Sequence, residues 1–283
     1  PRQKNVCLLR QRLLQQAAGD AMMYLDTQPP LMRVQGLSCA YGSRTVVRDI
    51  SFDLWPGEVL AIVGESGSGK TTLLNAVAAR HAPSAGQVSF DLRDHGLHEI
   101  YGMSEAQRRM LARTDWGFVH QNAADGLRMN VSAGANVSER LMALGQRNYG
   151  QLREQAIDWL ERVEISPSRI DDRPNTFSGG MRQRLQIARN LITQPRLVFM
   201  DEPTSGLDVS VQAKLLDMMR TLTRQMNLAA IIVTHDLAVA RLLAQRMMVM
   251  QNGQAVETGL TDQVLDDPQH PYTQLLVSSV LQP

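Results

Sequence analysis

The sequence predicts an α/β fold built around a parallel β-sheet. Three short runs, at residues 59–63, 197–200 and 229–233, are apolar throughout, as is typical of strands buried on both faces of a sheet. Helical patterns separate these runs, and an alternation of strands and helices favours parallel pairing. At 283 residues the chain is long enough for one large domain of this class.

An antiparallel β region is expected before the first buried strand, within residues 31–60. Ile50, Phe52 and Leu54 alternate there with polar residues, which is the pattern of a half-buried strand. The sequence Trp55-Pro56-Gly57 then ends the run with turn residues.

Residues 104–189 carry apolar side chains at helical spacing and few strand signals, which predicts a helical subdomain inserted in the α/β domain. Asn252-Gly253, between two short apolar segments, predicts a β-hairpin. We expect the main domain to cover residues 31–259 and a helical tail to cover 260–283. Residues 1–30 are expected to form a leader that is disordered or loosely helical.

Composition limits the classes of partner. Lys and Arg number 29 against 28 Asp and Glu, a net charge of +1, so no basic field favours direct binding of nucleic acid. The two cysteines, Cys7 and Cys39, have no metal-ligand spacing, and this usage predicts a cytoplasmic protein. No apolar run approaches the roughly 18 residues of a membrane span.

The segment after the first buried strand matches the phosphate-binding pattern G-x-x-x-x-G-K-T and precedes a helical pattern. Glycines let backbone N–H groups converge on phosphate oxygens, and the helix N-terminus adds positive potential. Lys70 is expected in a solvent-accessible loop, with its charge on the β- and γ-phosphates, and Thr71 is expected to bind Mg²⁺. ATP and Mg²⁺ are therefore the predicted cofactors, held by Gly64, Glu65, Ser66, Gly67, Ser68, Gly69, Lys70, Thr71 and Thr72.

Two adjacent carboxylates, Asp201 and Glu202, end the second buried strand. Adjacent strand residues point in opposite directions, so the two carboxylates can have different roles. Asp201 is predicted to bind Mg²⁺, and Glu202 to polarise the water that attacks the γ-phosphate.

The segment Phe177-Ser178-Gly179-Gly180-Met181 resembles the Leu-Ser-Gly-Gly-Gln signature of ATP-binding cassette (ABC) proteins. Phe177 and Met181 depart from that signature. The resemblance implies that Ser178, Gly179 and Gly180 contact the γ-phosphate, largely through a hydroxyl and backbone N–H groups at a helix start. Without its neighbours, the same segment would be an ordinary helix-start turn.

Four more residues follow in the order of that family, and the resemblance covers about residues 31–259. It implies that Tyr41 stacks on adenine, Gln121 binds metal and assists catalysis, Asp208 contacts nucleotide and His235 is catalytic. Taken singly, each could be structural: a strand aromatic, a loop amide, a helix cap or a strand-end histidine. The family also implies an ABC ATPase nucleotide-binding domain that pairs head to tail with a second ABC subunit, here as a homodimer.

Two partner classes remain open. Residues 265–276 resemble the tails of oligopeptide and dipeptide importer ATPases, which implies a membrane permease. Residues 125–142, 148–150, 170–174 and 275–281 resemble more closely the cassette proteins of bacterial carbon–phosphorus lyase systems, and this resemblance spans essentially everything after the leader. It implies docking on soluble lyase core subunits during phosphonate catabolism. A repair or translation ATPase is a further, smaller alternative. Arg128 and Arg140 are expected to supply charge to the docking surface.

Overall fold

The computed structural model describes residues 29–93 and 95–280 of the chain. Its larger sheet forms where the sequence is apolar without interruption, and β3, β7 and β8 are buried at every position. Five of its strands run parallel, and β10 is antiparallel to β9 at one edge. The strand order is β10 (Gln254–Leu260), β9 (Arg246–Gln251), β3 (Val59–Val63), β8 (Ala229–Thr234), β7 (Leu197–Asp201) and β6 (Trp116–Val119).

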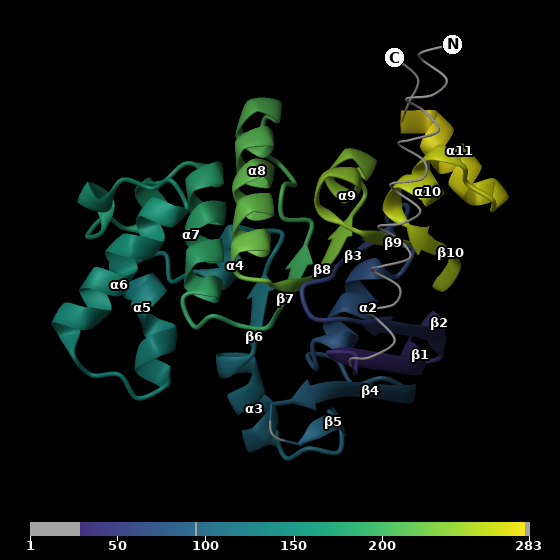
Figure 1. The fold of residues 1–283 in the computed structure, drawn as a ribbon, viewed down its shortest axis with the longest axis horizontal. Coiled ribbons are helices and arrows are strands. Elements are labelled where there is room, and N and C mark those ends of the chain that lie inside the picture. Colours follow the sequence, from purple (N-terminus) through teal and green to yellow (C-terminus); the bar gives the residue numbers. More distant parts are fainter. Residues whose placement is uncertain (1–28, 94, 281–283) are drawn as a thin grey trace, which may run out of the picture.

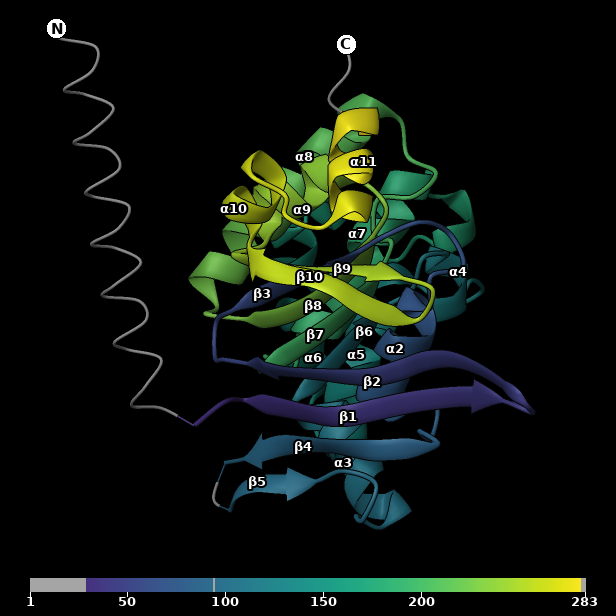
Figure 2. The ribbon, with the colours of Figure 1, turned by 90° about the vertical axis from the view of Figure 1, so that its right-hand side faces the viewer.

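A second, antiparallel sheet lies beside the first (Figure 2). Its order is β2 (Arg44–Leu54), β1 (Met32–Tyr41), β4 (Ala85–Leu92) and β5 (Gly96–Glu99). Strands β4 and β5 are additions to the predicted β region. The alternation of buried Val88 and Phe90 with more exposed neighbours is a signal that could have found β4.

Helix α2 (Lys70–Val77) joins the two sheets. It contacts β1 and β2 on one side and β7 and β8 on the other. Leu73, Leu74, Ala76 and Val77 are buried and belong to the same apolar core as Leu60 and Phe199. The helix that starts in the phosphate loop is therefore also the element that packs the two sheets together.

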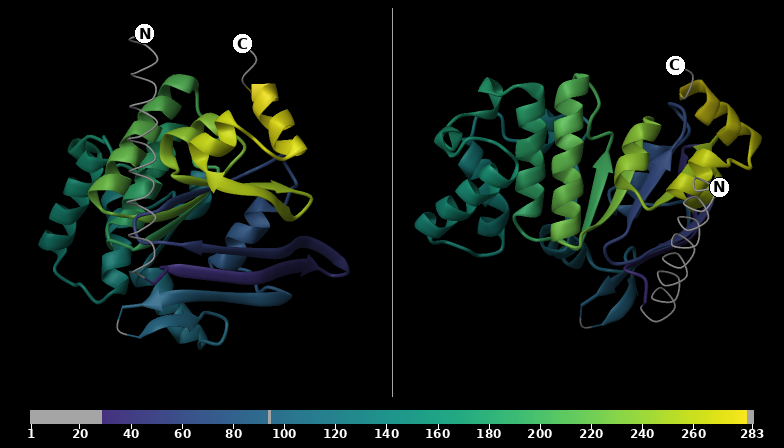
Figure 3. Two further views of the ribbon diagram at one scale, coloured as in Figure 1. Left: turned by 45° about the vertical axis from the view of Figure 1, so that its right-hand side comes forward. Right: turned by 45° about the horizontal axis from the view of Figure 1, so that its top comes forward.

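Most of the segment predicted as a helical subdomain is helical, and Figures 1 and 3 show its part from residue 133 onward extending away from the antiparallel sheet. The range also contains one short strand, β6, which the sequence analysis did not identify. Four apolar residues in a row cannot be told from a buried helix segment by periodicity. The helices are α3 (Glu105–Thr114), α4 (Ala123–Gly126), α5 (Ala133–Ala143), α6 (Tyr149–Arg162) and α7 (Gly179–Leu191), with single 3₁₀ turns at Pro167–Arg169 and Pro174–Thr176.

The C-terminal third completes the molecule. Helices α8 (Val209–Gln225) and α9 (Leu237–Leu243) pack beside each other and flank β8, and α10 (Thr261–Asp266) and α11 (Pro271–Val280) lie above the β9–β10 edge (Figure 2). The predicted hairpin forms, with Gln251 opposite Gln254. The predicted leader lies outside the described residues, apart from its last two. Within the described part of the chain, no helix is both long and apolar enough to cross a membrane.

Arg140 has a structural role that the sequence did not predict, and its contribution to a docking surface stays a prediction. Its guanidinium donates to the carbonyl of Trp116 at 2.6 Å and to those of Ala112 and Arg113. Burial, with Arg189 nearby, lowers the pKa of Arg140 to about 10. Arg140 thus connects α5 by hydrogen bonds to the end of α3 and the start of β6. Arg128, by contrast, is 65% exposed and pairs with Glu139 at 2.6 Å.

We expect Arg140→Met to lower the free energy of unfolding by about 2–3 kcal/mol, because three carbonyls lose a charged donor. Arg128→Met is the matched control and should cost less than about 1 kcal/mol, since it removes one exposed ion pair. Chemical denaturation of both variants measures the difference. Equal losses would contradict the structural role of Arg140.

Candidate active site

The phosphate loop begins where β3 reaches the carboxyl edge of the parallel sheet. Gly64 has φ of 146°, and a Cβ there would lie 2.2 Å from the backbone oxygen of Met250. Gly69 has φ of 100° and approaches the carbonyl oxygen of Val46. These two positions admit only glycine, which explains the spacing of glycines in the motif.

Lys70 is buried at 5% exposure, which corrects the expectation of a solvent-accessible side chain. Its Nζ donates to the carbonyl oxygens of Gly64 at 2.7 Å and Glu65 at 2.8 Å. Burial lowers the pKa of Lys70, and the carboxylates of Glu202 and Asp201 act in the opposite direction. The ammonium group therefore holds the loop closed around itself, at a position where phosphate oxygens would be further acceptors.

A hollow of about 640 Å³ opens above the loop. It brings together residues from the ends of four parallel strands, since the carboxyl ends of parallel strands share one edge. Its lining comprises Val46, Ser66, Gly67, Gly69, Lys70, Thr71, Thr72, Gln121, Glu202, Ser205 and His235. Half of the predicted site residues are therefore gathered here, and Ser205 is an additional member.

Thr71 lines this hollow, and Asp201 lies beside it. The Thr71 hydroxyl donates to Asp201 Oδ1 at 3.1 Å. Burial raises the pKa of Asp201, and the Thr71 hydrogen bond opposes that shift. Across the ranges that the structure describes, no three His, Cys, Asp or Glu side chains form a metal cluster. This sparse oxygen set suits Mg²⁺, which takes few protein ligands and completes its shell with phosphates and water.

Glu202 is the centre of a second group. Its φ of +41° is unusual for a residue with a side chain, and such strain is common at functional sites. His235 Nδ1 lies 3.1 Å from Glu202 Oε1, and Gln121 Nε2 donates to Glu202 Oε2 at 3.4 Å and to Ser205 Oγ at 3.2 Å. Gln121, which follows β6, and His235, which follows β8, thus orient the Glu202 carboxylate in the same hollow as the phosphate loop. This arrangement can position and deprotonate a water molecule.

The predicted signature residues do not line the hollow. Ser178 caps α7 by accepting the N–H of Met181 at 3.3 Å, and Gly180 packs against Val211 at the start of α8. Asp208 caps α8 by accepting the N–H of Val211 at 2.9 Å, and this bond is the main cause of its lowered pKa. The two helix starts form one surface of the chain, separate from the phosphate loop.

Two other expectations are refined by the structure. Tyr41 is 53% exposed at the end of β1, and its ring stacks on His81 at a centroid distance of 4.6 Å. Phe177, the departure from the signature, is buried in the core with the Arg169 guanidinium 4.4 Å from its ring centroid. Phenylalanine therefore serves as a core anchor before Ser178.

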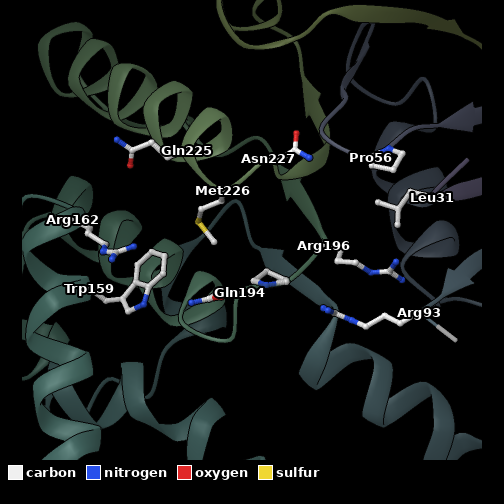
Figure 4. Close-up of a pocket in the computed structure, with 11 residues that line it drawn as sticks. Leu31, Pro56, Arg93, Trp159, Arg162, Gln194, Arg196, Gln225, Met226 and Asn227 are labelled. Atoms are coloured by element: carbon white, nitrogen blue, oxygen red, sulfur yellow. The ribbon is translucent and has the colours of Figure 1, made fainter. Parts of the chain in front are cut away.

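Figure 4 shows another hollow, of about 510 Å³, at the opposite, amino edge of the parallel sheet. Arg93, Arg162 and Arg196 point toward it, but each guanidinium already interacts with a neighbouring carboxylate or aromatic ring. Arg196 pairs with Asp91 and Asp115, Arg93 also pairs with Asp115, and the Arg162 guanidinium lies over Trp159. Its lining contains no glycine loop, so the hollow above Lys70 is the candidate active site.

A family model described as ABC transporter matches residues 47–205, which is more than half of the chain. The chain belongs to the ABC transporter family. Its members are ATPases, and the gathered phosphate loop, carboxylates and strand-end histidine agree with that activity. A second model, the C-terminal region of oligopeptide/dipeptide transporters, matches residues 256–283 of this ABC ATPase.

Three known proteins are similar to this ABC ATPase over most of its length. It is 64% identical to the phosphonates utilization ATP-binding protein PhnK of Escherichia coli (strain K12), over 89% of this chain and 98% of that protein. It is 37% identical to the dipeptide transport ATP-binding protein DppF of the same organism, over 81% of this chain and 67% of that protein. The chain also resembles the solved dimeric structure of the ATP-binding cassette MJ0796 bound to ADP and Pi. The sequence identity is 26% and the TM-score is 0.73, over 81% of this chain and 98% of that chain.

We expect Glu202→Gln to slow ATP hydrolysis by about 10²–10⁴-fold while ATP still binds, because the amide keeps the shape but cannot accept a proton. Steady-state phosphate release and nucleotide titration measure the two properties. Glu105→Gln, on the exposed face of α3, is the control and should behave as wild type. Hydrolysis within threefold of wild type in the Glu202 variant would contradict this role.

Proposed function

We propose that this ABC ATPase is the ATP-hydrolysing subunit of a phosphonate-utilisation system and acts in the cytoplasm with soluble carbon–phosphorus lyase subunits. The observation that carries the proposal is the 64% identity to PhnK, which extends over 98% of that protein. The identity to the peptide importer DppF is far lower and covers a smaller share of each chain.

In this proposal the phosphate loop and Lys70 bind the triphosphate, and Tyr41 stacks on the adenine ring. Thr71, Asp201 and Gln121 would hold Mg²⁺, which would neutralise phosphate charge. Glu202 takes a proton from the attacking water, and His235 and Gln121 orient that carboxylate. The contacts within 3.4 Å around Glu202 and the Thr71–Asp201 pair support these roles.

The ATP site is proposed to be completed by a second copy of the chain. Ser178, Gly179, Gly180 and Asp208 lie at helix starts that do not line the phosphate-loop hollow, and in this proposal those helix starts face a partner's nucleotide. The structural relative MJ0796 is described as a dimer with ADP and Pi. Such pairing allows nucleotide binding to close the dimer and hydrolysis to open it.

We place the lyase docking surface at a hollow of about 290 Å³ beside Gln121. It lies between β6 and helices α3, α4, α5 and α7, and its lining includes Arg80, Phe118, His120 and Asp125. The Arg80 guanidinium lies 3.9 Å from the centroid of the Phe118 ring and 3.3 Å from His120 Nε2. Aromatic and arginine side chains in a concave site are typical of protein interfaces.

This surface is connected directly to the hydrolytic carboxylate. The His120 carbonyl accepts hydrogen bonds from Gln183 and Gln186 of α7, and the next residue, Gln121, donates to Glu202. A partner that shifts β6 or α7 would therefore move Gln121 relative to Glu202. Docking can thereby control hydrolysis without contacting the nucleotide.

A membrane permease is the second candidate partner. The match of residues 256–283 to the C-terminal region of oligopeptide/dipeptide transporters favours it. The two candidates predict different companions at the same hollow: soluble subunits for the lyase system, and a cytoplasmic segment of a membrane protein for an importer.

Affinity purification of the tagged chain from its native cells, grown on a phosphonate as sole phosphorus source, distinguishes these partners. We expect lyase core subunits in the soluble fraction. Arg128→Glu reverses an exposed charge that pairs with Glu139, which in turn pairs with Arg189 in the lining of the hollow. This change should lower the recovery of the lyase core subunits at least threefold without changing ATP affinity. Arg220→Glu on α8 is the matched control. Recovery of a membrane permease in place of lyase subunits would contradict the proposal.

A further inference from the structure

The C-terminal helix makes a direct contact with the phosphate loop. The hydroxyl oxygen of Tyr272, on α11, accepts the backbone N–H of Glu65 at 3.0 Å. The Tyr272 ring is 93% buried, since its exposure is 7%, and it belongs to the main apolar core. The hydroxyl is therefore held at a fixed place against the second residue of the loop, 207 positions earlier in the sequence.

The Glu65 peptide is a sensitive place for such a contact. Its carbonyl oxygen accepts both Lys70 Nζ at 2.8 Å and the N–H of Ser68 at 3.2 Å. The Tyr272 hydroxyl fixes the other side of the same residue. The residues after Glu65 form the phosphate-binding part of the loop. A change in the backbone angles of Glu65 would therefore misdirect both their N–H groups and the Lys70 ammonium.

The position of Tyr272 is itself set by hydrogen bonds. The Glu257 carboxylate, on β10, accepts the N–H groups of Gln269 at 2.9 Å and His270 at 3.0 Å. His270 Nδ1 then accepts the N–H of Tyr272 at 3.1 Å. This chain links β10, the start of α11 and the phosphate loop.

The same C-terminal segment supports the loop at a second point. The N–H of Gly253, at the tip of the β9–β10 hairpin, donates to the Ser68 carbonyl at 3.0 Å. A Cβ on Gly253 would lie 2.2 Å from the Val46 carbonyl oxygen, so the hairpin tip is wedged against β2. The loop is thus held between a rigid hairpin tip and the Tyr272 hydroxyl.

We propose that Tyr272 is a positioning residue for ATP binding, whose hydroxyl presets the phosphate loop and makes nucleotide affinity depend on the seating of α11. A partner that displaces α11 would lower ATP affinity without touching the nucleotide site. The inference rests on the ATPase activity and is independent of which partner docks.

The test compares Tyr272→Phe with wild type, because phenylalanine keeps the buried ring and removes only the hydroxyl. We expect the dissociation constant for ADP and the KM for ATP to rise about 3–10-fold, the scale of one hydrogen bond. The kcat at saturating ATP and the Tm without nucleotide should stay near wild type. Tyr149→Phe, the same change at an exposed position on α6, should alter none of these values.

A second variant keeps the test decisive if Tyr272→Phe folds poorly. Glu257→Gln weakens the acceptor that seats α11 and should raise KM in the same direction by a smaller factor. In the double variant, KM should equal that of Tyr272→Phe, because both changes break one chain of contacts. An unchanged KM in either single variant, or a lowered Tm with KM unchanged, would overturn the proposal and leave Tyr272 a core residue only.

Discussion

The reversal of the chain around the Lys70 ammonium is the constraint on which the rest of the structure depends. A buried cation needs acceptors, and the carbonyls of Gly64 and Glu65 supply them only because the backbone there can turn back on itself. That turn places the start of α2 directly under the loop. Since α2 also packs both sheets together, the geometry that binds phosphate and the geometry that stabilises the core are set by one element.

Parallel pairing then determines what the loop faces. Strands β6, β7 and β8 all end at the edge where β3 releases the loop, so Gln121, Glu202 and His235 meet although they are far apart in sequence. The start of the signature helix does not line this hollow. This separation is the physical reason why we propose, rather than a site within one chain, a composite site between two chains for the signature residues.

Much of this arrangement could be predicted from the sequence, because the phosphate loop, the acidic strand end and the buried strands have strong local patterns. Other features have none. The burial of Lys70 depends on carbonyls that the motif only implies, and the structural role of Arg140 depends on a turn between α3 and β6. The contact of Tyr272 with Glu65 joins two segments 207 residues apart, and neither residue type signals it. Periodicity reports which face is buried, not which distant backbone group a side chain will meet.

We infer that the phosphate loop is formed before nucleotide arrives, held by Lys70 from within and by the C-terminal segment from outside. Amide hydrogen exchange of Glu65 in the nucleotide-free protein, followed by NMR, tests it most directly. We expect exchange at least about a hundredfold slower than in an unstructured peptide, because this N–H is donated to a buried hydroxyl. Exchange within about threefold of the peptide rate would show an open loop that nucleotide must order, and would contradict the account.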